Sequence, residues 1–229
     1  MTSVIAFDVN ETLLDLRALD PHFAALFGSS AVRAEWFVQM LQLAFVGGLT
    51  SDYVDFTTAQ KAALRMLGER HGIAMNDAQV VEVVDRMRTL PAHPEVVGAL
   101  ESLAGTSLRL VALTNSPVAV ADAQLTNAGL HGFFEAALSG DTVRALKPAA
   151  AAYRHVAEQC DVKLAEVRLV AAHAWDVSGA LVAGARAAFV ARPGMVLSPL
   201  GAAPDIVGRD LTEVAELIIE RDLGSASRS

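Results

Sequence analysis

Short apolar runs without polar alternation recur along the 229-residue chain. The clearest are Val4–Phe7, Leu108–Leu113, Val167–Ala171 and Ala187–Ala191, and Asp205–Val207 is a weaker example. An apolar run of this length indicates a strand that is buried on both faces of a parallel sheet. We therefore predict that these segments form one mostly parallel sheet.

Helix signals separate several of the predicted strands. Ser116–Pro117 is typical of an N-cap followed by the first helical residue, and Gly129 is placed to end that helix. Further helices are expected over about 148–160, after Asp176, and over Thr212–Arg221. This alternation of strands and helices predicts an α/β fold with an open, Rossmann-like sheet.

One long segment departs from the alternation. Between the first apolar run and Pro91 there is almost no strand signal, and apolar residues recur at the helical period. Thr57–Arg70 and Asp77–Arg88 are the clearest helical stretches. We predict a helical cap inserted over residues 15–91, and a discontinuous core made of residues 1–14 and 92–229.

Composition and charge narrow the class of partner. The chain has 26 acidic and 18 basic residues, a formal charge of −8, which argues against a nucleic-acid partner. The single cysteine, Cys160, excludes an intrachain disulfide and favours the cytoplasm. The N-terminus lacks a signal-peptide pattern, and the longest uncharged run, Trp36–Ser51, is too short and too polar for a membrane span. We expect a cytoplasmic protein without a membrane partner.

Polar side chains follow the ends of the predicted strands. Asp8 to Thr12 follow the first run, Thr114–Ser116 the second, and His173–Asp176 a later one, while Lys147 lies at a helix start. Because ligands of open α/β sheets bind beyond the carboxyl ends of the strands, these groups are expected to meet in one crevice. Two carboxylates, a hydroxyl and amide, an ammonium and an imidazole in one place predict an enzyme.

The order of these residues resembles the four motifs of the haloacid dehalogenase (HAD) superfamily. Asp8 with Thr12 matches the first motif, Thr114 the second, Lys147–Pro148 the third and Asp176 the fourth. The resemblance implies a Rossmann-like HAD core with a mostly parallel sheet and an inserted α-helical cap. It also implies a hydrolase with an aspartate nucleophile.

Within that superfamily the chain looks most like the type II 2-haloacid dehalogenases. The similarity lies in Thr114–Asn115, in Tyr153 six residues after Lys147, and in Ala174–Trp175–Asp176 followed by Gly179–Ala180. The resemblance implies that Asp8 attacks the halogen-bearing carbon and forms an ester, and that Lys147 keeps Asp8 ionised. Thr12 would then hydrogen-bond Asp8, and Asp176 would position Lys147 or the water. The substrate-binding residues so implied are Thr114, Asn115, Tyr153, Trp36, Phe37 and Phe56.

Three positions bear on the chemistry, and two of them, His173 and Phe37, differ from the family pattern. Phosphatases of the superfamily usually have a second Asp, which protonates the leaving group, where this chain has Asn10. A halide leaves without a proton, so a dehalogenase does not need this acid. His173 stands where the family often has Asn, and we expect it to form a general base with Glu11. Phe37 stands where the family usually has an arginine that helps to hold the halide.

The expected function is hydrolysis of short-chain 2-haloalkanoic acids to 2-hydroxy acids through an aspartyl ester, with fluoroacetate as one candidate substrate. No metal and no organic cofactor is expected. One alternative is a HAD-type phosphatase, or another HAD hydrolase acting on a small carboxylate-bearing substrate; the phosphatase would use Mg²⁺. A second alternative is a non-enzymatic binding module. The resemblance also favours a homodimer, for which Trp36–Ser51 offers an apolar surface.

Overall fold

The computed structural model describes residues 2–224 and contains one sheet of six parallel strands. Its strand order is β3-β2-β1-β4-β5-β6. The strands are β1 (Val4–Phe7), β2 (Arg109–Thr114), β3 (Ala137–Ser139), β4 (Val167–Ala171), β5 (Arg186–Val190) and β6 (Ile206–Gly208). All five predicted strands are present, so the α/β fold class is confirmed. The short strand β3 was not predicted.

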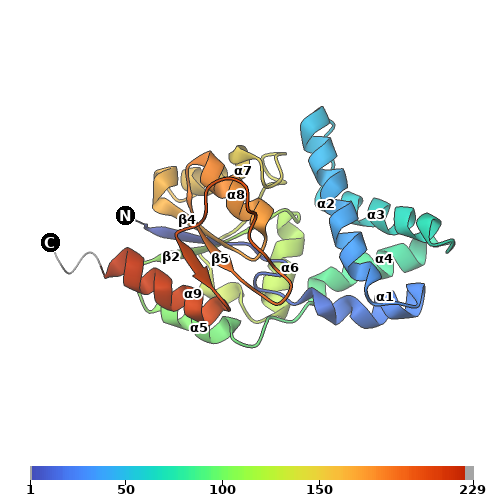
Figure 1. Ribbon diagram of the computed structural model, residues 1–229, viewed down its shortest axis with the longest axis horizontal. Coiled ribbons are helices and arrows are strands. Elements are labelled where there is room, and N and C mark those ends of the chain that lie inside the picture. Colours follow the sequence, from blue (N-terminus) through green and yellow to red (C-terminus); the bar gives the residue numbers. More distant parts are fainter. Residues whose placement is uncertain (1, 225–229) are drawn as a thin grey trace.

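Helices cover both faces of the sheet (Figure 1). They are α5 (Val96–Ala104), α6 (Val118–Asn127), α7 (Ala150–Gln159), α8 (Ala174–Ala183) and α9 (Leu211–Ile218). Alternate side chains of a strand point to opposite faces. Ile5 and Phe7 of β1 therefore belong to the same apolar cluster as α5 and α9, whereas Val4 and Ala6 pack with α7 and α8. Burial on both faces explains why the strands are continuous apolar runs.

Predicted helix starts in the core differ from the structure by one to three residues, and α7, expected from about residue 148, begins at Ala150. Helix α6 begins at Val118 with Pro117 as its N-cap residue, and the Ser116 hydroxyl has no hydrogen-bond partner among the described residues. Helix α8 begins at Ala174, so Asp176 lies in its first turn and not before it. The difference at α8 matters for the site, because the first turn of α8 faces the end of the sheet that carries Asp8.

The helices between β1 and Pro91 lie to one side of the sheet (Figure 1). They are α1 (Asp20–Phe27), α2 (Val32–Thr50), α3 (Phe56–Arg70) and α4 (Asp77–Asp85). The two chain segments that lead into and out of this group are paired. The Asp15 N–H donates to the Pro91 carbonyl at 2.8 Å, and Leu14 forms an antiparallel bridge with Ala92. On the basis of this paired neck we propose residues 15–91 as a cap on the remaining core.

Shorter helical turns complete the described chain. They are the 3₁₀ turns Leu16–Leu19, Arg86–Thr89, His131–Phe133 and Leu164–Glu166, and a π-helical turn over Ile219–Leu223.

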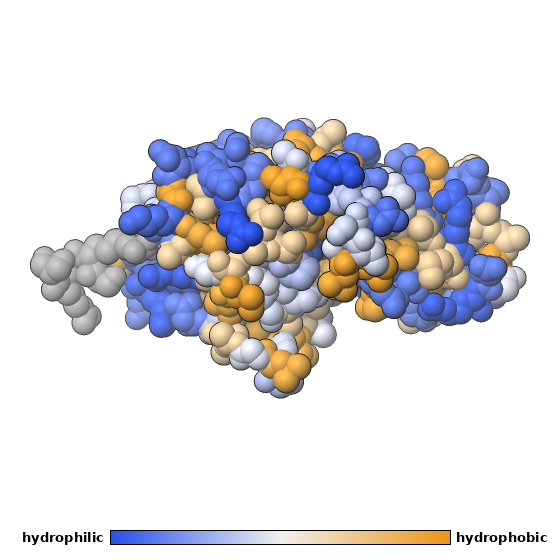
Figure 2. Space-filling model, turned by 90° about the horizontal axis from the view of Figure 1, so that it is seen from above, coloured by the Kyte–Doolittle hydropathy of each residue, from blue (hydrophilic) through white to orange (hydrophobic). Residues whose placement is uncertain are grey.

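One apolar cluster continues from the sheet into the cap, since it contains Phe7 of β1 as well as Trp36 of α2. From above, the surface carries small hydrophobic patches among hydrophilic ones (Figure 2). Within residues 2–224, each helix is too short or too polar to cross a membrane.

Candidate active site

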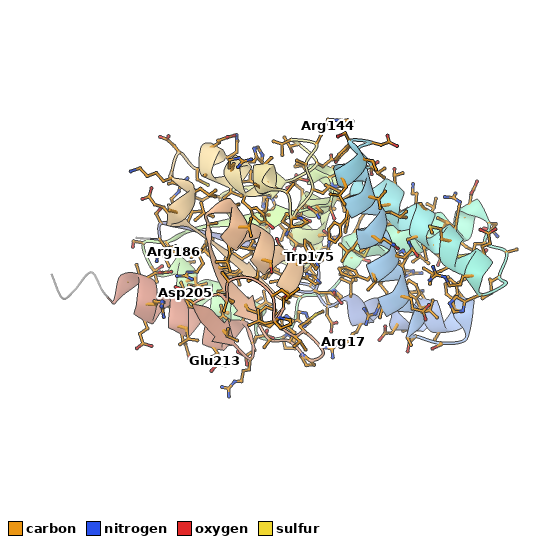
Figure 3. The ribbon with its side chains drawn as sticks, turned by 45° about the horizontal axis from the view of Figure 1, so that its top comes forward. Arg17, Arg144, Trp175, Arg186, Asp205 and Glu213 are labelled. Atoms are coloured by element: carbon orange, nitrogen blue, oxygen red, sulfur yellow. The ribbon has the colours of Figure 1, made fainter. Side chains whose placement is uncertain are left out.

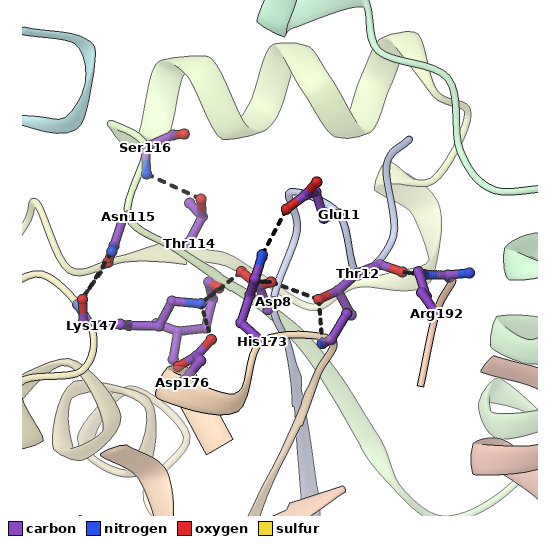
Figure 4. Close-up of polar contacts among 12 residues, drawn as sticks. Asp8, Glu11, Thr12, Thr114, Asn115, Ser116, Lys147, His173, Asp176 and Arg192 are labelled. Carbon is purple, nitrogen blue, oxygen red and sulfur yellow. Dashed lines mark hydrogen bonds and ion pairs between the residues drawn. The ribbon is translucent and has the colours of Figure 1, made fainter. Parts of the chain in front are cut away.

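The Lys147 ammonium lies between the carboxylates of Asp8 and Asp176 (Figure 4). Its Nζ donates to Asp8 Oδ1 at 2.8 Å, to Asp176 Oδ2 at 2.7 Å and to the Leu113 carbonyl at 2.9 Å. Asp8 follows β1, Lys147 precedes α7, and Asp176 lies in α8, so three segments of the core meet here. All three charged groups are buried. Buried charges persist only when they are paired and hydrogen-bonded, as these are.

The charges in this cluster determine which carboxylate stays ionised. Burial alone would raise the pKa of Asp8, but Lys147 and His173 hold that pKa well below its usual range. Burial and the charge of Asp8 raise the pKa of Asp176, and the opposing effect of Lys147 does not cancel them. Burial would lower the pKa of Lys147, but Asp176 and Asp8 raise it. Asp8 thus stays ionised, as a nucleophile must be.

Two hydroxyl groups fix the orientation of the carboxylates. Thr12 Oγ1 donates to Asp8 Oδ2 at 2.6 Å and accepts a hydrogen bond from the Ala172 N–H at 2.9 Å. Tyr153 OH donates to Asp176 Oδ1 at 2.6 Å. The structure therefore places Thr12 on Asp8, as the first motif suggested, and it places Tyr153, which was expected to bind substrate, on Asp176.

The segment after β2 supports Lys147. Asn115 Nδ2 donates to the Lys147 carbonyl at 3.1 Å, and the Lys147 N–H donates to Asn115 Oδ1 at 2.7 Å. Thr114 Oγ1 accepts a hydrogen bond from the Ser116 N–H at 3.1 Å. The Asn115 amide therefore holds the backbone of Lys147, a contact that sequence reasoning did not foresee.

His173 connects Asp8 with Glu11. Its Nδ1 lies 3.3 Å from Asp8 Oδ2, and its Nε2 lies 2.8 Å from Glu11 Oε2. Burial alone would lower the pKa of His173, but hydrogen bonds to Asp8 and Glu11 outweigh it and raise the pKa to about 9. His173 is thus an imidazolium at neutral pH in this state. Glu11 adopts the left-handed backbone conformation, with φ of 64°, which is uncommon for a residue other than glycine.

Aromatic rings pack against the imidazole. The Phe37 and His173 ring centroids are 5.2 Å apart with an interplanar angle of 15°, and those of Trp175 and His173 are 5.3 Å apart at 25°. Phe45 meets the Trp175 ring edge-on at 5.6 Å. Figure 3 shows Trp175 where the core meets the cap. Trp175 was not predicted as a site residue, although its position between His173 and Asp176 at a strand end could have indicated it.

A small chamber of about 10 Å³ adjoins Asp8, and a cavity of about 440 Å³ lies beyond it. The chamber is lined by Asp8, Asn10, Phe37, Leu41, Phe56, Thr114, Asn115, Lys147, His173 and Trp175. The wall residues shared with the outer cavity are Phe37, Leu41, His173 and Trp175. Trp36 lines neither space. Its Nε1 donates to the Gln60 carbonyl at 3.0 Å inside the cap.

The proteins of similar sequence and structure described below are 2-haloacid or haloacetate dehalogenases. The sequence model of the haloacid dehalogenase-like hydrolases matches residues 2–184. The chain is 28% identical over 226 residues to an (S)-2-haloacid dehalogenase of Pseudomonas sp. (strain YL), covering 98% of this chain and 97% of that one. It is 27% identical over 216 residues to haloacetate dehalogenase H-2 of Moraxella sp. (strain B), covering 93% and 96%. The structure of L-2-haloacid dehalogenase from Xanthobacter autotrophicus superposes with a TM-score of 0.91 at 25% identity, covering 96% of this chain and 100% of that chain.

Proposed function

The chain belongs to the haloacid dehalogenase-like hydrolase family, and from that premise we propose that it hydrolyses short-chain 2-haloalkanoic acids to 2-hydroxy acids. Fluoroacetate is one candidate substrate. The observation that carries the proposal is the ionised, buried Asp8 carboxylate, held by Lys147 and Thr12 against a small chamber. The names of the 2-haloacid and haloacetate dehalogenases that the chain resembles support the substrate class.

In the first step, Asp8 is the nucleophile. One carboxylate oxygen attacks the α-carbon from the side opposite the halogen, and the carbon–halogen bond breaks as the ester bond forms. The halide leaves with the bonding electrons, so the configuration at that carbon inverts. Lys147 and the His173 imidazolium supply positive charge near the substrate carboxylate. Thr114, Asn115 and Phe56 line the chamber and are the proposed substrate contacts.

Formation of the ester also changes the proton affinity of His173. Asp8 loses the negative charge that holds a proton on the imidazole, so that proton leaves together with the halide. Neutral His173, oriented by Glu11, then accepts a proton from the water that attacks the Asp8 carbonyl carbon. The bond from that carbon to the ester oxygen, which came from Asp8, breaks, and the leaving alkoxide takes the proton from His173. The Asp8 carboxylic acid returns its proton to His173, which restores the starting state.

The site does not fit the magnesium ion that the phosphatase alternative requires. The Lys147 ammonium already lies between the carboxylates of Asp8 and Asp176, within hydrogen-bond distance of both. Asn10 cannot donate a proton as an acid, and its Oδ1 accepts a hydrogen bond from Gln124 at 2.9 Å. We therefore propose a reaction without metal or organic cofactor. The expected homodimer and cytoplasmic location stay predictions.

Halide release tests this proposal. Fluoro-, chloro- and bromoacetate and L-2-chloropropionate would be assayed with and without EDTA, with Asp8→Asn as the inactive control. We expect halide release that EDTA leaves unchanged. A single turnover in isotopically labelled water should put the label into Asp8, because water attacks the carbonyl carbon of the ester. Activity on phosphoesters alone, or label in the product alone, would overturn the proposal.

A further inference from the structure

The cap contacts the hydrolytic pair through two residues of α2. Phe37 stacks on the His173 imidazole, and Arg33 Nη1 lies 3.4 Å from Glu11 Oε1. Arg33 is itself anchored, because its Nε donates to Asp20 Oδ1 at 2.6 Å. Glu11 and His173 belong to the core, whereas Arg33 and Phe37 are one helical turn apart in the cap. The proposed general base is therefore assembled from both parts of the chain.

The groups that form the ester have a different dependence on the cap. Within residues 2–224, the hydrogen bonds of the Asp8, Lys147 and Asp176 side chains all go to core residues. The cap contributes to this part only through the chamber walls, which include Phe37, Leu41 and Phe56. The nucleophile and its cation are thus complete in the core alone.

The chamber beside Asp8 is smaller than a haloacid, so its wall has to give way when substrate binds. A volume of about 10 Å³ is close to the space of a single water molecule. A haloacid is larger, so it reaches Asp8 only after the cap residues of the wall move away. Phe37 belongs to that wall, and it returns to His173 when the cap closes.

Ester formation weakens the contact between His173 and Asp8 just before His173 has to accept a proton from water. The Nδ1 contact with Asp8 at 3.3 Å loses its charge once Asp8 is esterified. The remaining contacts are the hydrogen bond to Glu11 and the stacked rings of Phe37 and Trp175. An aromatic face also favours the imidazolium that forms when His173 accepts the water proton.

We propose that Phe37 and Arg33 are positioning residues for ester hydrolysis, holding the His173 imidazole and the Glu11 carboxylate in place when the cap is closed. This inference rests on the proposed function. It makes the second half-reaction more sensitive than the first to the loss of these two side chains. It also gives Phe37 a task other than binding halide.

Rapid-quench measurement of chloride release from L-2-chloropropionate separates the two steps. In Phe37→Leu and Arg33→Met, we expect ester hydrolysis to slow by roughly 10–100-fold, while ester formation changes much less. A burst of chloride followed by a slow phase, with Asp8 ester detected by peptide mass spectrometry, is the expected signature. Phe37→Tyr keeps the aromatic ring, so its rate of ester hydrolysis should stay close to that of the wild-type protein.

Tyr53→Phe is the matched control. The Tyr53 hydroxyl donates to Asp141 and joins cap to core at a contact that does not involve His173. This variant should leave the ratio of the two rates unchanged. Equal slowing of both steps in Phe37→Leu, or the same burst in Tyr53→Phe, would overturn the inference while leaving the proposed function intact. Absence of chloride release from the wild-type protein would overturn the proposed function itself.

Discussion

Replacing Asp8 with Asn removes the same negative charge that ester formation removes, and it should lower the pKa of His173. In the wild-type protein, hydrogen bonds to Asp8 and Glu11 overcome the effect of burial and raise that pKa to about 9. The variant keeps Glu11 but loses the charge that lies 3.3 Å from Nδ1. Burial continues to favour the neutral imidazole, so the change has a defined sign.

The size of the change follows from the geometry of the contact. An opposite charge within a few ångströms typically shifts a pKa by about 1–3 units, so we expect a fall of that size. At pH 7.5, a histidine with a pKa of about 9 is about 3% neutral. A fall of about two units would make roughly three quarters of it neutral. Ester formation would thus turn His173 from a cation into an available base.

NMR titration of the imidazole ring signals in wild-type and Asp8→Asn protein measures this directly, with isotope-labelled histidine. His173→Gln identifies the His173 signal by its absence. Equal His173 pKa values in the two proteins would refute the reasoning, because Asp8 would then have no part in holding the proton.

Three further predictions concern the same cluster. His173→Ala should form the Asp8 ester but hydrolyse it about 10²–10⁴-fold more slowly. Mass spectrometry should therefore detect added mass on the Asp8 peptide. Unchanged turnover would contradict the assignment of His173 as the base. Lys147→Met leaves Asp8 and Asp176 buried without their cation. Urea unfolding should show a free energy of unfolding lower by about 3–5 kcal/mol, and halide release should be lost. A stability equal to that of the wild-type protein would contradict the proposed charge balance. Because the folded-state pKa of His173 is raised, its contribution to stability is complete below about pH 6.5 and is lost as pH rises through about 9, up to roughly 3 kcal/mol. Unfolding free energies measured across that range should fall in wild type relative to His173→Gln, and parallel curves would contradict the shift.

The strands of the core could be predicted because each lies between two layers of helices. Double burial leaves an unbroken apolar run in the sequence, as in Val4–Phe7 and Val167–Ala171. Strand β3 has only three residues, Ala137–Ser139, and a run that short carries no periodic signal. Helix starts could be predicted only to within a few residues. For example, Pro117 takes the N-cap position of α6 that the sequence pattern assigned to Ser116.

The strand-end groups could be placed together from sequence because the topology of a parallel sheet determines where strand ends meet. The contacts between cap and core could not be placed in this way. Helical periodicity locates an apolar residue on a face of α2, but it does not say which residue of the core that face meets. From the sequence, Phe37 was therefore expected to bind substrate in place of a family cation, and the structure shows its ring stacked on His173. Trp36, expected at the site, packs inside the cap and donates to the Gln60 carbonyl.

The paired neck at Asp15 and Pro91 bears on the direction in which residues 15–91 can move relative to the sheet. The chain crosses the neck twice, and the two crossings are tied by a hydrogen bond and an antiparallel bridge. Two tied crossings resist twisting more than a single crossing does, so we expect the proposed cap to open and close as a hinge. A hinge movement would bring the ring of Phe37 back to the same imidazole.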